Sequence, residues 1–139
     1  MAKLIRKNRT AGEKGQNLVE FAMVVPIFLI LVFAIVDFGM GFHAWITVTN
    51  ASREGARIGA VGADEDTIED RVRDTTSSIV DDNVIVTIDG AQGTPGDTVS
   101  VDVAYEYEMI TPLSNLLSMI GGGIGNQIDF HSKTEMRLE

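Results

Sequence analysis

Residues 15–36 read GQNLVEFAMVVPIFLILVFAIV, and this stretch decides the fold of the 139-residue chain. After Glu20 it has no charged side chain, and the next one is Asp37. A helix from Leu18 to Val36 would be about 28 Å long at about 1.5 Å per residue, close to a hydrocarbon core of about 30 Å. The stretch therefore predicts a helix that can span a membrane.

Three interpretations of this apolar helix compete. A buried core helix would need more apolar sequence around it than the rest of the chain supplies. A cleaved secretory signal would have a shorter apolar core and a small-x-small site, which Gly39-Met-Gly41 matches only loosely. A retained membrane helix fits best, with Phe42, His43 and Trp45 at the far interface, where amphipathic rings are favoured.

Charge is distributed unevenly along the chain. Residues 1–14 carry five basic side chains and one acidic side chain, a net charge of +4; since the whole chain carries −9, residues 15–139 carry −13. The positive-inside bias then places the N-terminus in the cytoplasm and the chain from about residue 46 outside it. The acidic body would repel phosphate, which argues against nucleic-acid binding. The absence of cysteine excludes disulfides and thiolate nucleophiles from these residues.

Two polar or helix-breaking positions stand inside the apolar segment. The Glu20 carboxylate would cost about 2.5–3.5 kcal/mol at the bilayer centre and less near an end. It either reaches the cytoplasmic headgroups or pairs with a cation in an assembly. Pro26 removes one backbone hydrogen bond and can kink the helix, which membrane helices tolerate. Whether such a kink has a role stays open at this point.

The junction GQNLVEF at residues 15–21 resembles a type IV prepilin processing site, in which cleavage follows a glycine and glutamate is the fifth mature residue. The resemblance makes Gly15 the last leader residue and Gln16 the new N-terminus. Cleavage after Gly12 would place Glu20 at mature position eight, which fits less well.

A finer resemblance is to the TadE-like minor pilins, or pseudopilins, of the tight-adherence (Tad, or Flp) pilus system. It rests on residues 15–26, on Asp37-Phe-Gly39, on Ala51-Ser-Arg-Glu-Gly-Ala-Arg57 and on the ending Met136-Arg-Leu-Glu139. The resemblance is strong over residues 15–59 and weak over 60–125. It implies as partners a prepilin peptidase, other pilin or pseudopilin subunits, an assembly platform in the inner membrane with its secretion ATPase, and the lipid bilayer.

The same resemblance implies roles for individual residues. Processing would involve Gly15, Gln16, Glu20 and Phe21, and assembly or packing would involve Glu20, Pro26, Arg53, Glu54, Gly55 and Arg57. Cleavage would create an ammonium group at Gln16, one helical turn from Glu20 and suited to the Glu20 carboxylate of a neighbouring subunit.

Beyond the membrane, the helix is expected to continue to about Gly59. Its apolar stripe consists of Val48, Ala51, Gly55 and Ile58. A mid-helix glycine costs about 1 kcal/mol against alanine, so a close packing partner is expected at Gly55. Arg53 and Arg57 lie one turn apart, either as a solvated, ion-paired face or as a docking surface.

The remaining sequence predicts a small head. A second helix should be capped near Asp66 or Thr67, with Ile68, Val72, Thr75 or Thr76, and Ile79 at helical spacing. Strands are predicted over residues 84–88, 99–107 and 128–138, and a short apolar helix over 112–120. The predicted fold class is α+β and pilin-like: a long N-terminal transmembrane helix continues into a head with a second helix and a three-stranded antiparallel sheet. A head of about 80 residues is marginal for an independent core, so the long helix would supply its missing apolar face.

The sequence contains no recognisable catalytic constellation. His43 and His131 are far apart in the sequence, and the glycine-rich stretches 90–96 and 121–125 lack the lysine of a phosphate loop. Acidic residues at 64–66 and 81–82 lack EF-hand spacing and would bind Ca²⁺ weakly at most. We therefore expect neither an enzyme nor a cofactor or specific metal site.

The expected organisation is a basic leader over residues 1–15, a transmembrane helix over 16–46 and an extracytoplasmic head over 47–139. The expected function is that of a structural minor pilin in the bacterial cytoplasmic membrane, used to assemble a Tad pilus for adhesion or biofilm formation. The alternative is an unprocessed, signal-anchored envelope protein whose head binds a ligand or partner.

Overall fold

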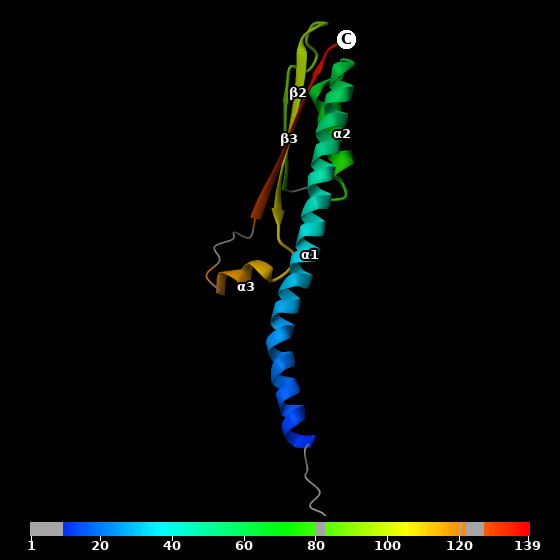
Figure 1. Ribbon diagram of the computed structural model, residues 1–139. Coiled ribbons are helices and arrows are strands. Elements are labelled where there is room, and N and C mark those ends of the chain that lie inside the picture. Colours follow the sequence, from blue (N-terminus) through cyan, green and yellow to red (C-terminus); the bar gives the residue numbers. More distant parts are fainter. Residues whose placement is uncertain (1–9, 80–82, 120, 122–126) are drawn as a thin grey trace, which may run out of the picture.

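One long helix organises the whole molecule (Figure 1). The computed structural model describes residues 10–79, 83–119, 121 and 127–139. Its elements are α1 (Thr10–Ala60), α2 (Glu65–Thr76), β1 (Val84–Asp89), β2 (Thr98–Glu108), α3 (Leu113–Met119) and β3 (Gln127–Arg137). The sheet and α2 lie along the upper part of α1, and α3 projects sideways below the sheet (Figure 1). The predicted α+β class, with a long helix and a small three-stranded head, is confirmed.

α1 is continuous over 51 residues, about 76 Å at about 1.5 Å per residue. It runs through Pro26 and also through the predicted junction between Gly15 and Gln16. At its upper end Ala63 N–H donates to Ile58 C=O at 3.3 Å and Gly62 N–H donates to Gly59 C=O at 2.9 Å. This pair of bonds is the Schellman arrangement, and Gly62 adopts its left-handed conformation with φ +87°.

The N-cap of α2 differs from the prediction. The sequence favoured a cap near Asp66 or Thr67, but the cap is Asp64, whose Oδ1 accepts the Thr67 N–H at 3.0 Å. Three consecutive acidic residues offer alternative starts, and the one that can reach the third backbone N–H of the helix wins. The helix ends at Thr76, so Ile79 lies beyond it but still packs against the core.

The three strands form an antiparallel sheet in the order β1-β2-β3. β2 is central, pairing Val103 with Val86 on one side and with Ser132 on the other. The strand predicted over residues 99–107 is confirmed as part of β2, and its alternate residues all point into the core and are buried: Val99, Val101, Val103, Tyr105 and Tyr107. Along β3 the inward side chains from Phe130 to Met136 are only half-buried. Two of them are polar: Ser132 and Thr134 each place a hydroxyl 2.9 Å from Ser52 Oγ on α1.

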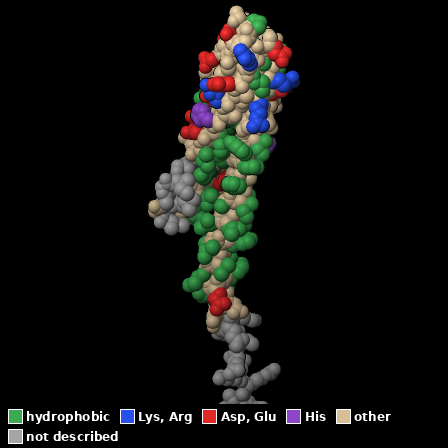
Figure 2. Space-filling model, turned by 45° about the horizontal axis from the view of Figure 1, so that its top comes forward, with side chains coloured by type: hydrophobic (Ala, Val, Ile, Leu, Met, Phe, Trp, Pro, Cys, Tyr) green, Lys and Arg blue, Asp and Glu red, His purple; other side chains and the backbone are tan. Residues whose placement is uncertain are grey.

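The hydrophobic core is shared between α1 and the head. α1 contributes four buried side chains, and α2 and β2 supply most of the others, among them Ile68, Val72 and Val101. Below the head, mostly hydrophobic side chains cover the surface of α1, whereas charged side chains gather on the head (Figure 2). The expectation that the helix supplies the apolar face missing from a small head is therefore confirmed.

Two glycines allow α1 to approach its neighbours closely. A Cβ on Gly55 would lie 2.7 Å from Val72 Cγ2 and 3.1 Å from Val101 Cγ1. One turn higher, a Cβ on Gly59 would lie 2.9 Å from Val99 Cγ2. The close packing partner predicted at Gly55 is thus present, and it is the contact between α1 and both α2 and β2.

This packing predicts that Gly55→Leu destabilises the head. The added side chain would overlap Val72 and Val101, and overpacking of a core costs about 1–3 kcal/mol. Gly39→Leu is the matched control, because a Cβ there meets nothing within 4 Å and the helix gains from losing a glycine. Thermal unfolding of the full chain in detergent should show a lower Tm for Gly55→Leu only. Equal Tm values for the two variants would contradict the packing.

Candidate functional site

The residues predicted for processing lie together on the lower part of α1. Gly15, Gln16, Glu20 and Phe21 are all exposed, and Phe21 is 70% exposed. The Gln16 side-chain amide donates to Glu20 Oε1 at 3.1 Å, one helical turn away. Among the described residues, the Glu20 carboxylate thus has one donor, an uncharged amide of its own helix, and its exposed position leaves it open to a further partner. Pro26 lies on the same bare section, exposed and without a break in the helix.

The lower part of α1 is apolar and uncovered. The helix described from Gly15 to Ala60 contains an 18-residue window with mean hydropathy 2.8, none of it buried in the protein. By length and composition this is a helix that could cross a membrane. The exposed side chains include Phe28, which is 60% exposed, and Ile35, which is 63% exposed. Such a continuous apolar surface needs lipid or other protein around it.

A buried carboxylate marks the upper end of this apolar section. Asp37 is 5% exposed. Its Oδ1 accepts the N–H groups of Ile110 at 3.0 Å and Thr111 at 3.1 Å, and its Oδ2 accepts the Thr111 hydroxyl. The Tyr107 hydroxyl donates to the Asp37 backbone C=O at 3.3 Å. Asp37 therefore ties the end of β2 and the start of α3 to α1.

The sequence showed Asp37 only as the residue that closes the apolar run. Its partners stand 73 and 74 positions later, and nothing local predicts them. One signal was available: a lone acidic residue beside an apolar run is costly to bury unless donors satisfy it. The cost of burying the Asp37 carboxylate therefore predicts that hydrogen-bond donors surround it, but it does not identify which residues supply them.

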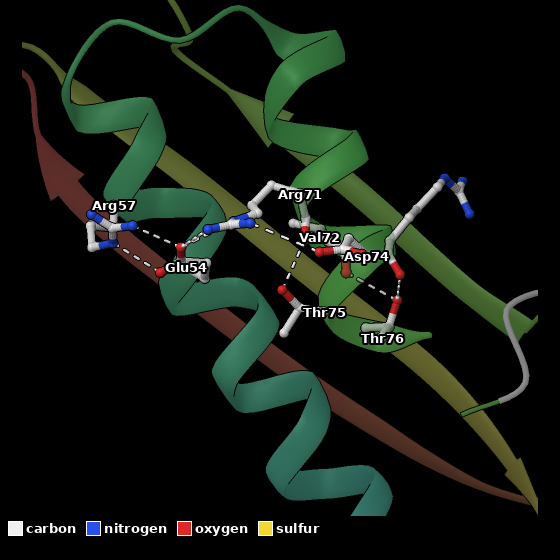
Figure 3. Close-up of polar contacts among 8 residues, drawn as sticks. Glu54, Arg57, Arg71, Val72, Asp74, Thr75 and Thr76 are labelled. Carbon is white, nitrogen blue, oxygen red and sulfur yellow. Dashed lines mark hydrogen bonds and ion pairs between the residues drawn. The ribbon is translucent and has the colours of Figure 1, made fainter. Parts of the chain in front are cut away.

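A charged cluster lies higher on α1, where the helix faces α2 (Figure 3). Glu54 accepts bonds from Arg57 Nε at 2.9 Å and Nη2 at 2.8 Å, and from Arg71 Nε at 3.1 Å. Arg71 also lies 3.8 Å from Asp74 on its own helix. Glu54 thus bridges two helices, and the ion-paired interpretation of this face holds for Arg57. The sequence analysis missed Arg71, because the pairing depends on how α2 folds back.

Electrostatics favour an ionised Glu54. The hydrogen bond from Arg57, helped by the bond from Arg71 and opposed by desolvation, lowers the pKa of Glu54 to about 2. The same bond raises the pKa of Arg57. Arg53 is exposed, and no carboxylate of the described residues forms an ion pair with it. The cluster therefore keeps a surplus of positive charge on an otherwise acidic protein.

The predicted site residues fall into two separate groups. From Glu20 to Glu54 the helix rises about 51 Å at about 1.5 Å per residue. The lower group has exposed, unpacked side chains. In the upper group Gly55 is part of the core, while Arg53, Glu54 and Arg57 line a shallow groove of about 510 Å³ with Arg71 and Met136.

The described residues contain no cluster of three metal-ligating side chains. The Asp64 carboxylate of the first acidic group is occupied as a helix cap, and the acidic pair at 81–82 lies outside the described residues. His131 on β3 places Nδ1 3.7 Å from Asp102 Oδ1. His43 is on α1, which packs against the opposite face of the sheet, so the two histidines do not meet.

The lowered pKa of Glu54 predicts a specific pH dependence. The pKa of Glu54 is about 2 in the folded chain, below the ordinary value of 4.5 for a glutamate. The stabilisation of the fold by ionised Glu54 is therefore complete above pH 4.5 and is lost as the pH falls towards 2. The Tm of wild type should therefore exceed that of Glu54→Gln at pH 6, and the two should converge near pH 2. Solvent around the exposed Arg57 keeps the difference modest.

The control for this comparison is Glu106→Gln, because Glu106 is an exposed side chain on β2 without a described ion pair. It should track wild type across the whole range. A constant gap between Glu54→Gln and wild type from pH 6 to pH 2 would contradict the ionic account.

Comparison with known proteins bears on the lower and middle parts of α1. The family model described as TadE-like protein matches residues 15–57, a segment that begins at the predicted junction and ends at Arg57. No curated protein and no solved structure matches the chain. The matched segment contains all nine residues singled out from the sequence, and the resemblance inferred there is confirmed over this segment: residues 15–57 are similar to the TadE-like family.

Proposed function

We propose that the chain is a structural, pilin-like subunit associated with a Tad pilus, held in the bacterial cytoplasmic membrane with its head outside. The observation that carries the proposal is the two-part character of α1. Its lower part is bare and apolar, and its upper part is built into the head. TadE-like proteins are pilin-like and associated with the Tad pilus, and the family match covers the transition between the two parts.

The proposed organisation follows from this division. Residues 1–15 are a leader removed by a prepilin peptidase, 16–46 are the transmembrane segment, and 47–139 are the extracytoplasmic head. The exposed Gly15 supports access to the scissile bond, because a small residue leaves room for the peptidase. The basic residues before Gly15 support a cytoplasmic N-terminus. The remaining partners are other pilin subunits, the assembly platform and its ATPase.

Glu20 is the proposed contact between subunits in the membrane. Its one described partner is an amide, so none of the residues that the structure describes neutralises its charge. In a low-dielectric environment an ammonium group from a neighbouring Gln16 would offset the cost of the carboxylate. The cut that removes the leader creates this ammonium, which couples processing to assembly.

The groove around Glu54 is the proposed contact between heads. Arg53, Arg57 and Arg71 line it with Glu54, and Arg71 also pairs with Asp74, so three guanidinium groups stand against two carboxylates on a chain of net charge −9. An acidic surface on a neighbouring subunit is complementary to it, and such complementarity favours orientation and encounter rather than affinity alone. The role is structural, without a catalytic step.

The test compares Glu20→Gln with wild type in cells that carry an active prepilin peptidase. Both chains should insert and both should begin at Gln16, because the glycine junction is unchanged. Only the variant should lose crosslinking to other pilin subunits in membranes and pilus-dependent adhesion. N-terminal sequencing and membrane crosslinking measure the two steps separately.

Met23→Ala is the control, since Met23 is 69% exposed on the same stretch and carries no charge. It should be cut and crosslinked like wild type. A wild-type chain that retains residues 1–15 would contradict processing and favour an unprocessed, signal-anchored protein. Undiminished crosslinking of correctly cut Glu20→Gln would instead contradict the pairing.

A further inference from the structure

A charge-free segment surrounds α3. From Met109 to Ile128 the sequence contains no Asp, Glu, Lys, Arg or His, although 22% of the chain is charged. The segment is bounded by Glu108 and Asp129. Outside the membrane helix, a run of this kind is unexpected on the surface of an acidic protein.

The height of α3 on the molecule is fixed by Asp37. The bonds from Ile110 and Thr111 to this carboxylate hold the chain immediately before α3 against α1. Asp37 is also where the apolar section of α1 ends, about 28 Å above Leu18 at about 1.5 Å per residue. A hydrocarbon core is about 30 Å thick, so α3 leaves α1 at the outer boundary of the membrane.

The surface at this level is uncharged, and large apolar side chains stand exposed on it beside Asn115 and Ser118. Met119 is 84% exposed and Ile110 is 64% exposed. On α1 the exposed rings of Phe38, Phe42 and Trp45 continue the surface upwards, with ring centroids 6.3 and 5.5 Å apart. An open groove of about 530 Å³, lined almost entirely by apolar atoms, separates these rings from Leu113 and Phe130.

We propose that α3 and residues 109–112 before it lie in the outer leaflet, at the boundary between headgroups and acyl chains. We call this part of the head the membrane foot. Three observations select lipid as the occupant: the surface is continuous with the bare face of α1, it lacks charge, and α3 runs crosswise to α1 rather than along it (Figure 1). Aromatic rings at this height match the interface belt of membrane proteins. The inference rests on the proposed insertion of α1 in a membrane.

The chemistry of the surface also defines which lipids it takes. Interfacial helices bind through buried apolar area and through attraction of basic residues to anionic lipid. α3 has no basic residue, so only the apolar contribution is available to it. Its insertion should therefore be the same in phosphatidylcholine vesicles with and without phosphatidylglycerol.

The experiment measures the depth of spin labels on the full chain in proteoliposomes. The chain has no cysteine, so Met119→Cys, Ile27→Cys and Val61→Cys each give one labelled position. All three side chains are strongly exposed, at 84%, 69% and 71%. Collision rates with oxygen, which partitions into lipid, are compared with those of a water-soluble nickel complex.

We expect the ratio of oxygen to nickel collisions at position 119 to be severalfold higher than at position 61 and below that at position 27. A water-like ratio at position 119, together with a lipid-like ratio at position 27, would overturn the proposed insertion of α3 but not the proposed insertion of α1. A water-like ratio at 27 would overturn both. Low collision rates with both reagents at 119, changing with the protein-to-lipid ratio, would mean that a second subunit covers α3, and would also overturn the proposal.

Discussion

The hydrophobic core of the head depends on one packing surface, the upper part of α1. Ala44, Val48, Ala51 and Ala56 of that helix are almost completely buried, and they close a core that the sheet and α2 cannot close alone. Small side chains predominate on this face because the other elements come close to the helix axis, and Gly55 and Gly59 permit the closest approach. The head is therefore not attached at the end of α1: the upper part of α1 is its central structural element.

Packing of the head along α1 sets the positions of its features along the axis of that helix. Since the head packs along α1, each of its features lies at a definite distance from the end of the apolar section. Asp37 holds the base of the head at that end, and Glu54 lies about 26 Å higher at about 1.5 Å per residue. The proposed membrane foot and the basic groove are therefore held at two separate levels, suited to lipid and to a neighbouring head respectively.

Much of this structure could be predicted from the sequence, because it follows from local periodicity. The apolar run predicted the lower part of α1, and the residue pattern of strands predicted β2 and β3. The cost of glycine in a helix predicted close packing at Gly55. Local pattern did not predict which distant groups meet. The bond from Thr111 to Asp37 and the pairing of Arg71 with Glu54 depend on how the chain returns to α1. The cap at Asp64 was missed for a different reason, since neighbouring acidic residues are equivalent until one side chain reaches the helix.

In the proposed arrangement, one uninterrupted helix both crosses the membrane and forms the central element of the head. The most direct measurement is the distance between spin labels at Phe28→Cys and Val61→Cys in the same chain, reconstituted in liposomes. Phe28 lies in the bare section, and Val61 lies at the upper end of the helix. A continuous helix predicts one narrow distribution centred at about 50 Å, from about 1.5 Å per residue. A broad or much shorter distribution would mean that the helix breaks at the membrane surface, and would contradict the account.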